Sequence, residues 1–185
     1  MNDATPERLP LSVSVRPITA PDLHTVERSL PSVRPDVHSG RFVVQQAGEA
    51  VYLIAWCGDL PVGHVLLRRT GSTDLELRAR LPALAPHPYL EGMAVRPDYQ
   101  SRGIGTQILI AADHEVTGWG FTQIGLAVGI ENRRARALYE RTGYREAGLG
   151  EFPITWSYVT PDGREGTEGE SCVYLVKPLQ QASGR

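Results

Sequence analysis

The stretch PDYQSRGIGTQIL, residues 97–109, places Gly103 and Gly105 between a turn and a helical pattern. A helix N-terminus leaves its first amide N–H groups unpaired and carries partial positive charge, so it attracts anions. Glycine at such a position removes the Cβ that would otherwise keep a ligand away from the backbone. The stretch therefore predicts either a phosphate-binding loop or a tight turn that needs positive φ angles, and the rest of the chain must decide.

The composition is that of a globular domain. The chain has 185 residues, of which 41% are hydrophobic and 22% charged, with a net charge of −2. We expect one domain over residues 1–185, with loose tails at 1–11 and 179–185. The charge argues against a nucleic-acid partner, and the arginines between residues 133 and 145 are interpreted as a solvated helix face. No stretch is long enough to span a bilayer and no signal peptide is evident, so we expect a cytoplasmic protein without a membrane partner.

The two cysteines, Cys57 and Cys172, lie far apart and each sits inside an apolar run. Neither belongs to a CxxC or a Cys/His spacing, so no metal site is expected. They are interpreted as small core residues, although the sequence leaves a disulfide between them open.

Alternation and helical spacing together predict a mixed α/β (α+β) sheet of about seven strands with helices on its faces. The expected strands are residues 11–18, 51–57, 62–69, 89–95, 122–128, 151–159 and 171–179. The expected helices are residues 19–30, 41–47, one that follows the glycine loop and ends at Gly118 to Gly120, and 131–143. Residues 71–88 are read as a surface loop, and residues 161–169 as the tip of the last hairpin.

Three known anion-binding patterns can be tested against the glycine loop. A Walker loop needs four residues between its glycines and a lysine after them, and neither is present. A dinucleotide-binding GxGxxG loop needs a third glycine where this chain has Ile108, and the acidic residue expected further on is not at a strand end. The third pattern, Q/R-x-x-G-x-G/A, is matched by Gln100, Gly103 and Gly105.

This third pattern resembles that of the GNAT superfamily of acyl-coenzyme A-dependent N-acyltransferases. A second stretch, NRRARALYERTGY at residues 132–144, resembles the helix that follows the fifth strand in that family. The opening VRPITAPDL at residues 15–23 is similar to the family's first strand and turn. The resemblance runs from about residue 13 to 178. It implies the GNAT fold, with a splayed pair of central parallel strands, acetyl-coenzyme A as co-substrate and no metal.

The resemblance also implies which residues bind the co-substrate. The loop and helix start would hold the pyrophosphate through Gln100, Ser101, Arg102, Gly103, Ile104, Gly105 and Thr106. The backbone of Met93, Ala94 and Val95 would pair with the pantetheine arm. Asn132 matches a position that contacts the pantetheine region, and it is equally a candidate N-cap of the next helix. Arg102 either adds a phosphate contact or points into water.

Amide formation from a thioester needs a base and an acid. An amine with a pKa near ~10.4 must lose a proton at a cost of roughly 4–5 kcal/mol at pH 7, and a carboxylate can accept it. Glu91 is the candidate base, because alternation puts Tyr89, Glu91 and Met93 on one face toward the cleft; the alternative is a strand-end charge paired with an arginine. Tyr139 is the candidate acid for the leaving thiolate, the alternative being a core tyrosine.

The acceptor is less well defined by the sequence. Protein N-terminal acetyltransferases carry a glutamate five positions before the asparagine, where this chain has Ala127, and acidic residues are frequent in the loops at 28–41, 71–88 and 150–170. We expect direct acetyl transfer, in a ternary complex, to a primary amine of a small molecule. The alternatives are a protein lysine or N-terminus as acceptor, or a non-catalytic acyl-coenzyme A sensor. The apolar strand at 171–179 would allow a homodimer.

Overall fold

The computed structural model describes residues 12–32, 34–84, 86–160 and 162–180. The tail expected at residues 1–11 lies outside the described residues. Of the tail expected at residues 179–185, only residues 179 and 180 are described, and Leu179 is not loose. Its N–H donates to the Thr122 carbonyl at 2.7 Å, and its side chain packs against the main core.

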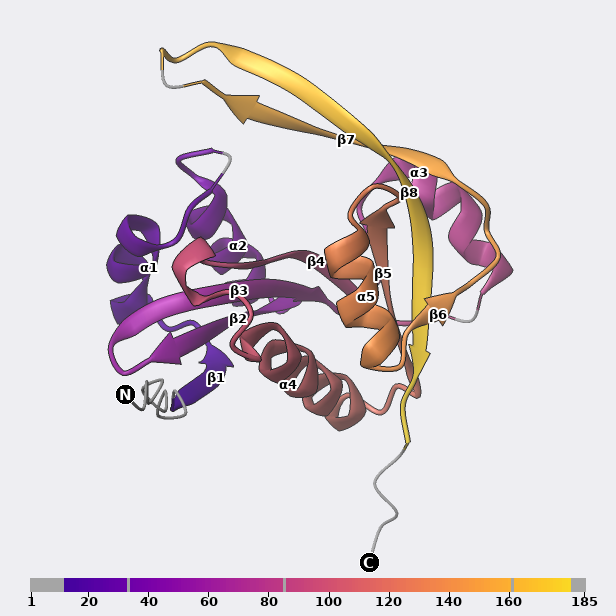
Figure 1. The fold of residues 1–185 in the computed structure, drawn as a ribbon, viewed down its shortest axis with the longest axis horizontal. Coiled ribbons are helices and arrows are strands. Elements are labelled where there is room, and N and C mark those ends of the chain that lie inside the picture. Colours follow the sequence, from indigo (N-terminus) through magenta and orange to yellow (C-terminus); the bar gives the residue numbers. More distant parts are fainter. Residues whose placement is uncertain (1–11, 33, 85, 161, 181–185) are drawn as a thin grey trace, which may run out of the picture.

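The expected mixed sheet is present, with eight strands and helices around it (Figure 1). The strands are β1 (Val13–Pro17), β2 (Ala50–Cys57), β3 (Leu60–Arg68), β4 (Tyr89–Val95), β5 (Gln123–Gly129), β6 (Arg145–Glu146), β7 (Phe152–Val159) and β8 (Glu165–Pro178). The α-helices are α1 (Leu23–Ser29), α2 (Val37–Gln46), α3 (Leu75–Arg80), α4 (Ile104–Gly118) and α5 (Arg133–Arg141). The strand that the sequence did not predict is the two-residue β6.

The strand order is β1-β2-β3-β4-β5-β8-β6, with β7 paired to β8. Every pairing is antiparallel except that of β4 with β5, which is parallel. A parallel pair needs a crossover, and α4 supplies it in the chain between the two strands. The glycine loop precedes α4, so it lies beside the end of the only parallel pair among the described strands.

The two faces of the sheet are covered by different helices, as the alternation in β2 shows. Leu53 and Ala55 are buried in the core cluster that contains the apolar face of α4. Tyr52, Ile54 and Trp56 are buried on the opposite face, in the cluster that contains α1. The helical stripe predicted in α4 is confirmed, since Ile108, Ala112 and Val116 are fully buried and Trp119 packs partly against them. Both cysteines are free.

The prediction of a surface loop at residues 71–88 is wrong, because this segment contains α3. Asp74 begins the helix by accepting a hydrogen bond from the Leu77 N–H at 2.8 Å, an N-cap of the usual kind. Leu77 is fully buried against Tyr89 and Phe152. Leu77 is the one buried residue of α3 and its neighbours are polar. The segment therefore shows no apolar periodicity from which the helix could be predicted.

Several boundaries also differ from the prediction, and two of them matter for the site. Helix α2 begins at Val37 rather than at Arg41, and it ends at Gln46. Strand β8 begins at Glu165, so residues predicted for the tip of the last hairpin pair with β7 instead, with Gly169 opposite Thr155. The last two strands therefore form a long two-stranded arm, and we call β7 together with residues 165–171 the β7–β8 arm.

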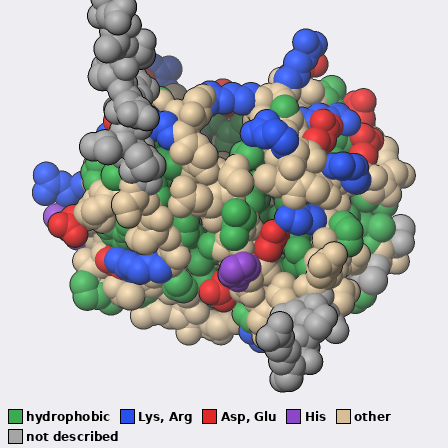
Figure 2. All heavy atoms as spheres, turned by 60° about the horizontal axis from the view of Figure 1, so that its bottom comes forward, with side chains coloured by type: hydrophobic (Ala, Val, Ile, Leu, Met, Phe, Trp, Pro, Cys, Tyr) green, Lys and Arg blue, Asp and Glu red, His purple; other side chains and the backbone are tan. Residues whose placement is uncertain are grey.

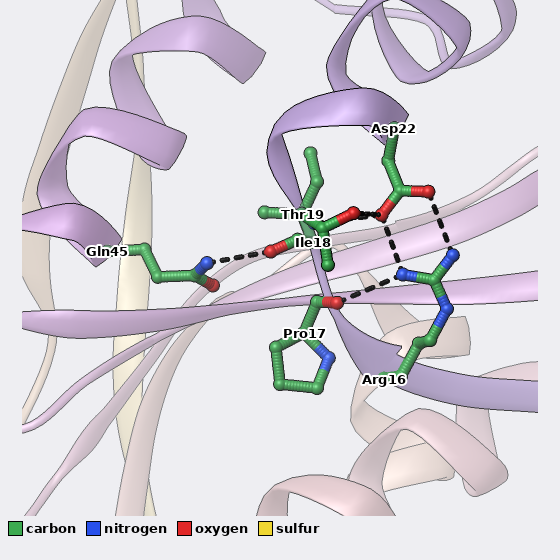
Figure 3. Close-up of polar contacts among 6 residues, drawn as sticks. All are labelled: Arg16, Pro17, Ile18, Thr19, Asp22 and Gln45. Carbon is green, nitrogen blue, oxygen red and sulfur yellow. Dashed lines mark hydrogen bonds and ion pairs between the residues drawn. The ribbon is translucent and has the colours of Figure 1, made fainter.

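A network of polar side chains fixes the entry to α1 (Figure 3). The Asp22 carboxylate accepts hydrogen bonds from the Thr19 N–H at 2.8 Å and the Thr19 hydroxyl at 2.6 Å. Arg16 donates to both oxygens of Asp22, at 2.6 and 2.8 Å. These bonds, first that from Arg16 and then those from Thr19, lower the pKa of Asp22 well below its ordinary value. Close by, Gln45 donates to the Ile18 carbonyl at 2.8 Å, which ties α2 to the end of β1.

We predict that Asp22→Asn lowers the free energy of unfolding by about 1 kcal/mol at neutral pH. A carboxyl whose pKa is lowered by folding stabilises the protein above its unfolded pKa of about 3.9, and this contribution fades as the pH falls toward the native pKa. Urea unfolding of both proteins at pH 7 and at a pH below the ordinary aspartate value checks this. A difference of equal size at both pH values would contradict it.

Candidate functional site

The parallel strands β4 and β5 pair over only two positions, Tyr89 with Gly125 and Leu90 with Leu126. Beyond Leu90 the two strands separate, so the residues up to Val95 have no partner on that side among the described strands. Unpaired backbone N–H and C=O groups need other partners. The expected splay of the central parallel strands is therefore confirmed, and it leaves an open strand edge at the middle of the sheet.

A bulge at Gly92 changes which side chains face the gap. The pairing of β3 with β4 shifts there, so that two residues of β4, Gly92 and Met93, lie opposite one residue of β3. Gly92 has a φ of 59°, and a side chain at this position would overlap the Arg41 guanidinium. Glycine is thus required both by the backbone conformation and by the close approach of Arg41.

The bulge also corrects one prediction, that Tyr89, Glu91 and Met93 share a face. Tyr89 is buried on the face of α3, and Glu91 lies opposite Leu66, whose side chain is on the face of α1. Met93 instead packs with the cluster of α4, on the other side of the sheet. The extra residue of a bulge reverses the alternation, so Met93 faces the glycine loop while Glu91 faces away from it.

A cleft of about 850 Å³ occupies the gap between the diverging strands. Its walls come from β4 and β5, from α2 and α5, from the segment before α3, and from the β7–β8 arm. The residues used below that line it are Arg41, His64, Asp74, Glu91, Met93, Ala94, Ala127, Gly129, Asn132, Tyr139, Trp156 and Glu170. Of the predicted site residues, Glu91, Met93, Ala94, Asn132 and Tyr139 are therefore brought together.

The glycine loop joins the end of β4 to α4 and is held by its own side chains. The Gln100 amide donates to the Val95 carbonyl at 2.9 Å. Arg134, in the first turn of α5, donates to the Gln100 side-chain oxygen Oε1 at 2.5 Å and to the Ser101 hydroxyl at 3.1 Å. Ser101 has a φ of 61°, an uncommon conformation for a residue with a side chain. Arg134 was missed by the sequence analysis, which treated the arginines of this helix as one solvated face.

The loop ends where α4 begins, as expected. Gly103, with a φ of 79°, is the N-cap of this helix. The amides of Ile104, Gly105 and Thr106 thus belong to the first turn, where a helix has no partner for them and favours an anion. A side chain at Gly105 would come within 2.9 Å of Leu138 on α5, so glycine lets the start of α4 approach α5 closely.

Two other arginines near the loop, Arg102 and Arg136, are engaged with the protein. The Arg102 guanidinium lies over the Tyr99 ring, 5.3 Å from its centre. Arg136 forms ion pairs with Glu140 and Glu146, both at 2.9 Å. On the face shown in Figure 2, basic and acidic side chains lie interspersed rather than gathered by sign. The solvated-face interpretation therefore fits Arg136 but not Arg134.

Asn132 and Tyr139 sit on the same helix, one at its start and one inside the cleft. The Asn132 side chain accepts a hydrogen bond from the Ala135 N–H at 3.1 Å, so it is the N-cap of α5. Tyr139 is 7% exposed, and its ring packs edge-on against Tyr144 with 5.7 Å between ring centres. Burial raises the pKa of Tyr139 to about 12, so its hydroxyl keeps its proton at neutral pH and can donate it.

Glu91 is anchored by an arginine. The Arg68 guanidinium donates to the Glu91 carboxylate at 2.5 Å, and both side chains are largely covered. This is the ion pair that the sequence analysis named as the alternative to a base. The pair leaves part of the carboxylate facing the cleft, where it contributes negative charge.

A cluster of buried side chains holds Arg41 in the cleft wall. Arg41 donates to His64 Nδ1 at 2.9 Å, and because arginine has no acceptor, His64 must accept. Burial, followed by the charge of Arg41, lowers the pKa of His64 well below its ordinary value. The Tyr52 hydroxyl bonds His38 at 2.6 Å and the Tyr52 ring lies under Arg41. His64 thus stays neutral and fixes the guanidinium over Gly92.

The described residues contain neither a cluster suited to a metal ion nor a helix suited to a membrane. Over the described ranges, from residue 12 to 180 with three single-residue gaps, no group of three histidine, cysteine or acidic side chains is placed to hold a metal ion. Within the same ranges, no helix is long and apolar enough to cross a membrane.

The sequence also resembles known proteins. It is 38% identical to the ribosomal protein bS18 alanine N-acetyltransferase of Escherichia coli K12 over an alignment of 76 residues. This alignment covers 41% of this chain and 49% of that protein. Over 90 residues it is 31% identical to the chloroplastic GCN5-related N-acetyltransferase 4 of Arabidopsis thaliana, which covers 48% of this chain and 30% of that protein. The chain thus spans about half the length, or less, of these curated relatives.

Solved structures share the fold over nearly the whole chain. The ribosomal protein S18 alanine N-acetyltransferase from Escherichia coli has a TM-score of 0.60 at 20% identity, covering 94% of this chain and 98% of that one. PaiA N-acetyltransferase from Thermoplasma acidophilum, in complex with coenzyme A, has a TM-score of 0.61 at 15% identity, covering 91% and 99%. Residues 21–144 match the model of the acetyltransferase (GNAT) family. This chain therefore belongs to the GNAT family of acetyltransferases.

Proposed function

We propose that the protein transfers the acetyl group of acetyl-coenzyme A to a primary amine by direct attack in a ternary complex. The observation that carries this proposal is the position of the glycine loop and helix start of α4 beside a splayed strand, with Tyr139 at the same gap. A diphosphate suits the unpaired amides of the first turn. An extended arm rich in amides suits the unpaired edge of β4, because it can form the hydrogen bonds that a neighbouring strand would form.

The co-substrate supplies the activated acetyl group, and the residues of this chain would hold it in three places. The amides from Ser101 to Thr106 would bind the diphosphate, with Gln100 and Arg134 keeping the loop in shape. The backbone of Met93, Ala94 and Val95 would bind the pantetheine arm. An N–H on this strand, or the Asn132 amide, would also donate to the thioester oxygen as negative charge develops on it.

Tyr139 would protonate the leaving thiolate. Its phenol stays protonated at neutral pH, as an ordinary tyrosine with a pKa of ~10 does, and burial raises its pKa further, to about 12. The packing of its ring against Tyr144 fixes the direction of the hydroxyl. A general acid must keep its proton until the leaving group needs it, and a buried phenol meets that requirement.

For the acceptor we propose a small molecule that carries a cationic amine. Three carboxylates line the acceptor side of the cleft, those of Asp74, Glu91 and Glu170, and Trp156 of the arm lines it too. Negative charge and an aromatic face both favour an ammonium group over a neutral or anionic ligand. Arg41 in the same cleft adds a positive charge that could accept a carboxylate on the acceptor.

A second candidate is the N-terminus of a protein. The 38% identity to the bS18 alanine N-acetyltransferase of Escherichia coli over 76 residues favours it. The departure at Ala127, where such enzymes carry a glutamate, speaks against it. Ala127 lines the cleft, so the glutamate carboxylate that such enzymes have at this position is absent from the cleft of this protein.

Thiol release from acetyl-coenzyme A tests the acceptor. We expect release with at least one class in a panel of polyamines, aminoglycosides and amino acids, and slower release with peptides that begin with alanine. Faster turnover of the peptides would replace the small-molecule proposal by the second candidate. Binding of acetyl-coenzyme A without release by any amine would instead favour a non-catalytic sensor.

We predict that Arg134→Ala weakens coenzyme A binding roughly tenfold, or about 1.4 kcal/mol. The variant lacks the donor that fixes Gln100 and Ser101. The loop is then less ordered in the free protein, and part of the binding free energy is spent on ordering it. The matched control is Arg133→Ala, which removes the neighbouring exposed charge and should bind within about twofold of the wild type. Calorimetric titration measures both affinities. Equal weakening in both variants would show a general charge effect instead.

We also predict that Tyr139→Phe lowers kcat by ~10²-fold while coenzyme A affinity is retained. Phenylalanine keeps the ring contact with Tyr144 and removes only the hydroxyl. Steady-state kinetics with the best amine of the panel, together with a melting curve as control for the fold, test this. Unchanged turnover would remove Tyr139 from the mechanism.

We further propose a cytoplasmic protein that can pair with a second copy. The strand segment named for this pairing, residues 171–179, is mostly flanked, since it pairs with β5 on one side and at Glu146 and Arg145 with β6 on the other. Within β8, the side that faces away from β7 carries no partner strand among the described residues over residues 165–170 of the β7–β8 arm. Light scattering would measure the oligomeric state.

A further inference from the structure

We infer that Glu170, on the β7–β8 arm, is the carboxylate that takes the proton from the acceptor amine. This inference rests on the proposed function and assigns a residue that the sequence motifs did not point to. Figure 1 shows the arm running out from the sheet beyond the place where β4 and β5 diverge. The base of this arm lines the cleft through Ile154, Trp156 and Glu170.

The pairing of β5 with β8 puts Glu170 on the acceptor face of the sheet. Ala127 is opposite Tyr174 and Gly129 is opposite Cys172. Directly opposed residues share a face, and so do residues two apart in one strand. Glu170 therefore lies on the same face as Ala127, the position where a glutamate is absent.

The space over β5 is open to the Glu170 side chain because Gly129 has no side chain. A Cβ at Gly129 would overlap the Glu170 carboxylate. The φ of Gly129 is not positive, so the backbone does not require glycine there. Glycine is needed at this position only because the Glu170 side chain occupies the space that a Cβ would fill. A carboxylate from β8 thus reaches over β5 into the region that a β5 glutamate at position 127 would serve.

The other carboxylates of the cleft are already engaged. Glu91 accepts from Arg68 at 2.5 Å, and Asp74 accepts from the Leu77 N–H as the N-cap of α3. The Glu170 carboxylate has no ion pair or hydrogen bond to any residue that the structure describes, and the side chain is exposed to the cleft. Its lone pairs are free to receive a proton.

The step is balanced as follows. The acceptor enters as an ammonium, its N–H bond breaks, and the proton passes to a Glu170 oxygen. The freed lone pair forms the new C–N bond with the acetyl carbonyl carbon, the C–S bond breaks, and the thiolate takes the Tyr139 proton. The nitrogen of the new amide then loses its second proton, which returns through water to the Tyr139 phenolate. Glu170 then releases its proton to water. The charged and titratable groups that face the same cleft are Arg41, His64, Asp74, Tyr89, Glu91, Tyr139 and Cys172.

The test compares Glu170→Gln with Glu168→Gln, which removes the neighbouring charge of the same arm outside the cleft lining. We expect Glu170→Gln to lower kcat/KM for the amine ~10²-fold at pH 7. The loss should shrink as the pH approaches the amine pKa of about 10, since the acceptor then arrives neutral. Glu168→Gln should stay within about twofold of the wild type, and Glu170→Asp should recover part of the rate.

Three outcomes would overturn the assignment. They are a Glu170→Gln rate at pH 7 close to that of the wild type, a loss of equal size at every pH, or the pH-dependent loss in Glu91→Gln instead. Wild-type protein that releases no thiol with any amine would overturn the proposed function as well. Coenzyme A titrations of each variant distinguish these failures from a loss of the cofactor site.

Discussion

The divergence of β4 and β5 is the constraint on which the rest of the site depends. Two parallel strands that pair only through Tyr89 and Leu90 leave the remainder of β4 with unpaired backbone groups in the middle of a sheet. Such groups are costly to bury without partners. An extended ligand rich in amides can supply those partners, while the side chains around the gap can act on what the ligand carries.

At the same divergence, different groups of residues face the two sides of the sheet. On one face lie the residues proposed to bind the cofactor, namely the glycine loop, Met93, Arg134 and the start of α4. On the other lie the α2 segment and the β7–β8 arm, which are proposed to receive the acceptor. The bulge at Gly92 marks the division, because it turns Met93 toward one half and leaves Glu91 facing the other. Arg41, fixed by the neutral His64, packs over that bulge.

The sequence predicted the parts of the site that depend on local geometry. A glycine loop before a helix, an asparagine N-cap and an inward tyrosine on α5 are each readable from a few neighbouring residues, and all three are present. The sequence did not reveal parts that depend on distant partners. Helix α3 has only one buried leucine, so its sequence shows no helical stripe. The Gly92 bulge packs against Arg41, which comes from the distant helix α2. The position of the Glu170 side chain depends on the register of β8 against β5.

The central claim is that main-chain amides at the start of α4 bind the diphosphate while β4 pairs with the pantetheine arm. A crystal structure of this protein with coenzyme A tests it most directly. The account predicts diphosphate oxygens within hydrogen-bonding distance of the Gly103 to Thr106 amides, with the arm alongside Met93 to Val95. A coenzyme A molecule bound away from the gap between β4 and β5 would contradict it.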